Sequence, residues 1–124
     1  MSDYAVLKGH EVVPCSSDEW LLQSADARRV GLDEVGDWHV STVFLGLDHS
    51  FGSEPPLWFE TMVFARESSS DLFCDRYSTW EDAVTGHQSV VEQLLAGAVP
   101  DALLDLRARR QQQGDARLHD VVNP

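Results

Sequence analysis

Two histidines and two carboxylates in the middle of the chain have side chains suited to chemistry. They are Asp48, His49, Glu60 and His87, with Tyr77 nearby. Imidazole and carboxylate groups bind Zn²⁺ or non-haem iron, and they also serve as general acids and bases. An enzyme of this kind requires all four side chains to converge in one pocket.

The spacing of these residues favours a structural interpretation. No pair among them has the tight spacing of a metal motif such as H-x-x-x-H. Asp48 and His49 can order a tight loop, and His87 suits a half-buried histidine bonded to a carboxylate. Polar motif residues commonly serve turns and buried hydrogen bonds, so we give this interpretation the greater weight.

The two cysteines, Cys15 and Cys74, are too few for a secreted disulfide framework. Cys15 precedes an expected helix, whose dipole can lower the pKa of a thiol. No catalytic-cysteine signature surrounds it, so we expect packing roles for both. The sequence has no glycine-rich phosphate loop, nucleophile elbow or H-E-x-x-H motif, and we predict no cofactor.

Alternating apolar residues predict the strands that position these groups. The segments are 28–35, 38–47, 57–65 and 72–78, with a turn at Gly36. Short connections between them favour an antiparallel β-meander of three to four strands. Trp38, Val40, Thr42 and Phe44 share one face of their strand. The other face is also largely apolar in its second half, which predicts a strand covered on both sides.

Capping signals predict three helices. A short one starts at Ser17, carrying Trp20 and Leu21 inward. A long one begins at Thr79 and ends near Gly97. A C-terminal helix runs from Ala102 to about Gln113. We therefore predict an α+β fold with the long helix packed on the sheet, along a stripe formed by Ala83, His87, Val90, Val91, Leu94 and Leu95.

The 124 residues are strongly acidic, with a formal net charge of −12. Residues 1–106 hold 19 acids and 5 bases, and residues 107–124 hold 2 acids and 4 bases. We divide the chain accordingly into a single acidic domain and an Arg/Gln-rich helix end and tail. The charge argues against direct nucleic-acid binding and against an anionic membrane surface. The absence of a signal-peptide pattern or a long apolar run predicts a cytoplasmic protein.

Aromatic residues are the alternative candidates for binding. Phe51 and Trp58 flank Pro55-Pro56 in a loop, where exposed aromatics rimmed by acids resemble a protein-binding hot spot. The opposing interpretation is that the loop folds back and covers the end of the sheet. The candidate binding residues are Asp48, His49, Phe51, Trp58, Tyr77 and Trp80.

Several of these residues carry a resemblance to a known family. The stretches STV at 41–43, LGLDHSFG at 45–52, FETMVF at 59–64 and YSTWEDAVTGH at 77–87 keep a characteristic order and spacing. In this pattern the chain resembles a small uncharacterised family of bacteriophages, prophages and actinobacterial genomes. The resemblance implies phage or mobile-element biology, where many small acidic proteins bind and block a host protein.

Two functional hypotheses follow. The first is a non-enzymatic phage-type accessory protein that binds a host protein, as an acidic inhibitor of a defence or nucleic-acid-handling protein. The alternative is a small metal-dependent or acid–base enzyme, hydrolase-like, that uses Asp48, His49, Glu60 and His87. A third, weaker hypothesis is a homo-oligomer formed through the C-terminal helix.

Overall fold

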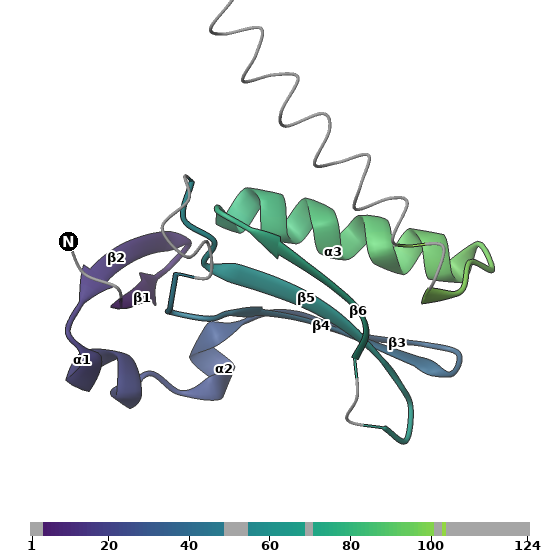
Figure 1. Ribbon diagram of the computed structural model, residues 1–124, viewed down its shortest axis with the longest axis horizontal. Coiled ribbons are helices and arrows are strands. Elements are labelled where there is room, and N and C mark those ends of the chain that lie inside the picture. The colour runs from purple at the N-terminus through teal and green to yellow at the C-terminus, as the bar shows by residue number, and fades with distance from the viewer. Residues whose placement is uncertain (1–3, 49–54, 69–70, 101–102, 104–124) are drawn as a thin grey trace, which may run out of the picture.

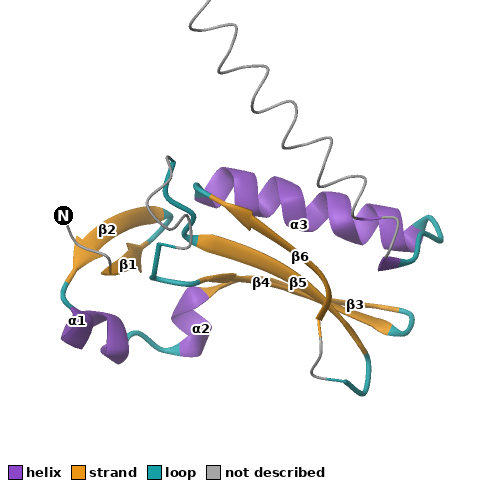
Figure 2. Cartoon of the chain, in the orientation of Figure 1, coloured by secondary structure: helices purple, strands orange, loops and turns teal. Residues whose placement is uncertain are grey.

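The computed structural model describes residues 4–48, 55–68, 71–100 and 103. The fold is α+β, as predicted: a four-stranded antiparallel sheet carries one long helix, and a separate two-stranded sheet lies near one end of it (Figures 1 and 2).

The main sheet is a meander of four strands in chain order. They are β3 (Arg29–Val35), β4 (Trp38–Phe44), β5 (Phe59–Ala65) and β6 (Asp71–Tyr77), and each pairs antiparallel with the next. All four lie within one to three residues of the predicted bounds. Gly36 adopts a φ of 57° in the tight β3–β4 turn, a conformation that favours glycine.

Helix α3 (Trp80–Leu95) lies across one face of this sheet (Figure 1). Its predicted N-cap is confirmed, because the Thr79 side chain accepts a hydrogen bond from the Asp82 amide. Gly97 follows the helix with a φ of 97°. Leu95, predicted to face inward, is instead 70% exposed. The buried residues of α3 are Ala83, Gly86, His87, Val90 and Leu94.

The face of the sheet beneath α3, here called the covered face, holds two apolar clusters. One contains Val40, Val63 and Val90, and the other contains Phe44, Phe59 and Ala83. The predicted sharing of one face by Val40, Thr42 and Phe44 is confirmed, since all three are buried. The expected covering of both faces is not observed within the described residues, where α3 is the one helix that packs broadly on the sheet.

The N-terminal hairpin is an element that the sequence analysis missed. Strands β1 (Tyr4–Lys8) and β2 (Glu11–Cys15) pair antiparallel around a turn at Gly9. Pro14 sits in β2, where a proline argues against a strand unless it lies at an edge. Ala5 and Leu7 pack into the second apolar cluster and so close one end of the core.

Two short helices, α1 (Ser17–Leu22) and α2 (Ala25–Arg28), connect the hairpin to the main sheet. The N-cap of α1 is Ser16 rather than Ser17, and it forms a reciprocal capping box with Glu19. Of the two residues predicted to face inward, Trp20 is half-buried and Leu21 is exposed.

Gly46 joins the hairpin to the main sheet and ends β4 earlier than predicted. It has a φ of 74°, and a Cβ placed there would collide with the Trp20 ring. The Trp20 Nε1–H donates to the Leu45 carbonyl at 3.0 Å, and the Ala5 amide donates to the Gly46 carbonyl at 2.9 Å. Only glycine combines this backbone conformation with so close an approach.

Most of the predicted C-terminal helix lies outside the described residues. Its residue Leu103 is described and is buried in the apolar cluster with Val40 and Val63. Among the described residues, no helix is long and apolar enough to cross a membrane.

Candidate functional site

His87 is the centre of a hydrogen-bonded network on the covered face. Its Nε2 lies 2.6 Å from Asp33 Oδ2, and its Nδ1 lies 2.7 Å from Thr42 Oγ1. Gly31 makes room for the ring, because a Cβ at that position would lie 2.9 Å from Nε2. Helix α3 and the edge strand β3 are thereby joined through one imidazole.

The network continues into the centre of the sheet. Thr42 Oγ1 lies 2.5 Å from Thr61 Oγ1, and the two threonines face each other across β4 and β5. A carboxylate only accepts, so His87 Nε2–H donates to Asp33 Oδ2, and Nδ1 shares a hydrogen bond with the Thr42 hydroxyl. A further hydrogen bond joins the Thr42 and Thr61 hydroxyls, so each side chain of the network has a partner.

The network separates the two apolar clusters of the core. Thr42, Thr61 and Asp75 occupy one row across three adjacent strands, and all are buried. His87 lies between Ala83 and Val90 on the helix in the same way. We call Thr42, Thr61, Asp75 and His87 the polar row. A buried row of this kind fixes the register between helix and sheet, because a shift leaves its groups without partners.

The order carboxylate, imidazole, hydroxyl is also that of a hydrolase triad. Here the hydroxyl is inaccessible, since Thr42 is 0% exposed, whereas the Asp33 side chain is 53% exposed. A nucleophile must reach its substrate, and this one is enclosed by the core. The arrangement therefore joins helix to sheet and offers no site for nucleophilic attack.

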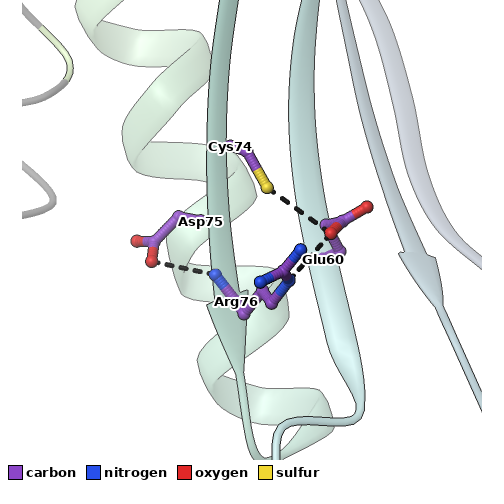
Figure 3. Close-up of polar contacts among 4 residues, drawn as sticks. All are labelled: Glu60, Cys74, Asp75 and Arg76. Atoms are coloured by element: carbon purple, nitrogen blue, oxygen red, sulfur yellow. Dashed lines mark hydrogen bonds and ion pairs between the residues drawn. The ribbon is translucent and has the colours of Figure 1, made fainter. Parts of the chain in front are cut away.

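A second polar cluster lies on the opposite side of the sheet, which we call the open face. Arg76 Nε donates to Glu60 Oε2 at 2.9 Å, and the Cys74 thiol donates to the same oxygen at 3.4 Å (Figure 3). Glu60 and Arg76 are a cross-strand pair between β5 and β6. In Figure 3 the Asp75 side chain points to the side of the sheet that α3 covers, away from Glu60. Its Oδ1 accepts a hydrogen bond from the Arg76 amide at 2.9 Å.

The open-face cluster is only partly enclosed. The Glu60 side chain is 9% exposed and the Arg76 side chain 38%. A carboxylate so deeply buried requires a charged or hydrogen-bonding partner, and the guanidinium supplies it. The chemistry of the cluster is an ion pair with a neighbouring thiol.

The four residues of the alternative enzyme hypothesis do not all meet. Glu60 lies on the open face and His87 on the covered face, with the sheet between them. Asp48 Oδ1 accepts from the Leu57 amide at 3.0 Å and so ties the two ends of a loop. His49 lies outside the described residues. Among the residues described, no three His, Cys, Asp or Glu side chains form a group that could hold a metal ion.

Three of the aromatic candidates for binding belong to the apolar core or pack against it, namely Tyr77, Trp58 and Trp80. Tyr77 is buried, and the absence of a side chain at Gly86 makes room for its ring. Trp58 is half-buried against the core, with its amide donating to the Tyr77 carbonyl at 3.0 Å. Trp80 stacks on His10, with ring centroids 4.0 Å apart. The sequence did not predict this contact, because it did not predict the hairpin that carries His10. Phe51 lies outside the described residues.

The pKa of the Cys15 thiol is shifted from its ordinary value. Burial, and secondly the Glu19 carboxylate, raise the pKa of Cys15 above its ordinary value. The shift is therefore opposite in direction to the one that a helix dipole alone would cause. A thiol with a raised pKa has less reactive thiolate at neutral pH, which fits a packing role.

Comparisons with protein families, curated proteins and solved structures give no match for this chain. The resemblance to a phage and prophage family stays a prediction. The motif residues nonetheless have physical roles here: Gly46 admits Trp20, Asp48 closes a loop, and Gly86 and His87 seat α3 on the sheet.

Proposed function

We propose that this chain is a non-enzymatic protein-binding domain of phage or prophage type, which uses its acidic exterior to engage a basic surface on a host protein. The partner we favour is a defence or nucleic-acid-handling protein, because a groove that binds phosphates is basic and attracts acidic side chains.

The exposed side of α3 is the observation that carries this proposal. It presents Glu81, Asp82 and Glu92, and the helix contains no Lys or Arg. Acids on a rigid helix keep fixed spacing, which suits repeated contacts with a basic groove. The same charges also speed association at low salt.

The positions of His87 and Glu60, two residues suited to catalysis, support a binding role. Both nitrogens of His87 are engaged inside the core, and Glu60 is held by Arg76 on the opposite face. The site required by the hydrolase-like alternative is split by the sheet, so we give that alternative no further weight.

The test is affinity capture by the immobilised full-length chain from a bacterial host lysate, followed by affinity measurements with the purified partner. A charge-driven contact should weaken by roughly tenfold or more between about 0.05 and about 0.5 M salt. An affinity that does not change with salt would contradict the proposal.

A matched pair of triple variants locates the contact. Glu81→Gln/Asp82→Asn/Glu92→Gln removes three acids from α3, and Glu11→Gln/Asp18→Asn/Glu67→Gln removes three exposed acids elsewhere. The change in net charge is identical. The α3 variant should bind much more weakly than the control. Equal losses would mean that total charge, and not the helix surface, attracts the partner.

A further inference from the structure

The open face of the sheet is apolar at its centre. Leu32, Ser41, Met62 and Cys74 form one row across the four strands, in register from β3 to β6. Leu32 is 50% exposed, and Met62 and Cys74 are half-buried. Phe64 and Val43, also half-buried, flank this row. Within the described part of the chain, no helix packs broadly on this face as α3 does on the other.

The charged side chains that the structure describes on the open face are paired, although the body of the chain is strongly acidic. Residues 1–106 contain five bases, and three of them, Arg29, Arg66 and Arg76, lie on this face or at its rim. Each is paired with an acid: Arg29 with Asp26 at 3.7 Å, Arg66 with Glu34 at 3.5 Å and Arg76 with Glu60 at 2.9 Å. The acids of α3 have no such basic neighbours on their own helix.

We infer that the open face is a self-association surface, on which a second copy of this chain docks sheet to sheet. Two copies with a net charge of −12 repel each other wherever unpaired acids meet. At the open face the approaching charges are already paired, so the repulsion is weakest there and the apolar rows can pack together. A basic partner gains little attraction from acids that are already paired, which makes a second copy the better occupant.

The direct test is the molar mass of the full-length chain in solution, measured by light scattering and sedimentation from about 1 to about 200 µM. A concentration-dependent dimer is expected. A monomer at every concentration would overturn the inference, and the proposed host partner would be unaffected by that result.

Two exposed leucines provide a matched pair of variants. Leu32→Lys places a charge at the β3 end of the apolar row on the open face, and Leu95→Lys makes the same change on α3, where the leucine is 70% exposed. Both side chains are exposed enough for the fold to survive, which circular dichroism would verify. Leu32→Lys should weaken the dimer roughly tenfold or more, since an unpaired ammonium would be buried, and Leu95→Lys should not. The reverse result would place the contact elsewhere.

Salt and thiol labelling separate this contact from other modes of association. Raising salt from about 0.05 to about 0.5 M should tighten the dimer, because it screens the repulsion between acidic bodies. Binding of a basic host partner should weaken over the same range. A dimer that dissociates at high salt would contradict an apolar contact.

Cys74 lies on the open face and Cys15 on the hairpin. Dimer formation should slow the alkylation of Cys74 relative to the monomer and leave that of Cys15 unchanged. Leu32→Lys should abolish the protection. A dimer that leaves Cys74 as reactive as in the monomer would exclude the open face and point to another surface, such as residues 107–124.

Discussion

The covered face and the open face each hold a carboxylate that is joined to a basic side chain, but solvent reaches opposite ends of the two pairs. On the covered face the Asp33 side chain is 53% exposed, while His87 and the threonines behind it are buried. On the open face Glu60 is buried, and Arg76 reaches the solvent. The Asp33–His87 pair continues into a buried network inside the core, whereas the Glu60–Arg76 pair balances charge at the surface. The energetic cost of a substitution should therefore depend on its face.

The sharpest contrast uses one residue type on one strand. Phe59→Ala opens a cavity in the covered-face core and should cost about 3–5 kcal/mol of unfolding free energy. Phe64→Ala, on the open face of β5, should cost about 1–1.5 kcal/mol, since that side chain is only half-buried. Denaturant unfolding of both variants measures the difference. Equal losses would mean that both faces are equally enclosed.

The next contrast concerns the polar row. Thr42→Val keeps the shape of the side chain but removes the hydrogen-bond partner of both His87 Nδ1 and Thr61 Oγ1, at a cost of about 1–3 kcal/mol. Thr42→Ser retains the hydroxyl and loses one methyl, which costs about 1 kcal/mol. Thermal and chemical denaturation distinguish the two. A valine variant as stable as the wild type would show that the network contributes no net stability.

The ion pair of the open face should have a smaller effect. Arg76→Met removes the charged partner of Glu60 and should cost about 1–2 kcal/mol. Adding Glu60→Gln should recover part of that loss, because a neutral amide is less costly to bury than an unpaired carboxylate. A double-mutant cycle gives the coupling energy. A coupling near zero would show that solvent already satisfies Glu60.

The smallest effect concerns the hairpin thiol. Because the pKa of Cys15 is raised, its thiolate fraction at neutral pH is low, and alkylation should be slower than that of an ordinary cysteine peptide. The rate should climb as the pH rises through the raised pKa. Mass spectrometry of the alkylated full-length chain follows Cys15 separately from Cys74. A rate at neutral pH above that of the peptide would contradict the raised pKa.

The sequence predicted the elements whose signals are local. Thr79 and Gly97 bracket α3, and alternation set the faces of β4, so these boundaries needed no knowledge of the fold. The hairpin was missed because its strands are short and Pro14 weakens the strand pattern. Leu95 was assigned to the buried stripe because periodicity does not reveal where a helix passes the edge of its sheet.

The site was harder to predict, because its partners are distant in sequence. His87 meets Thr42 and Asp33, which lie on other strands and carry no shared motif. The alternation of residues along β5 correctly placed Glu60 on the same face as Met62 and Phe64, with Thr61 on the other face. Both faces of β5 are rich in apolar residues, so the pattern did not say which one the helix would cover. That choice separates Glu60 from His87 and decides against the four-residue pocket of the alternative enzyme hypothesis.

The attachment of the N-terminal hairpin has a consequence for synthesis of the chain. Ala5 and Leu7 leave the ribosome before the residues they pack against, which include Phe44, Phe59 and Tyr77. A two-stranded hairpin is at best marginally stable alone in water. At translation rates of about 5–20 residues per second, its apolar side chains stay uncovered for several seconds before the residues that they pack against are synthesised. The hairpin is therefore stabilised only by segments made after it, and a nascent chain stalled before Phe59 would expose the hairpin to chaperones and proteases.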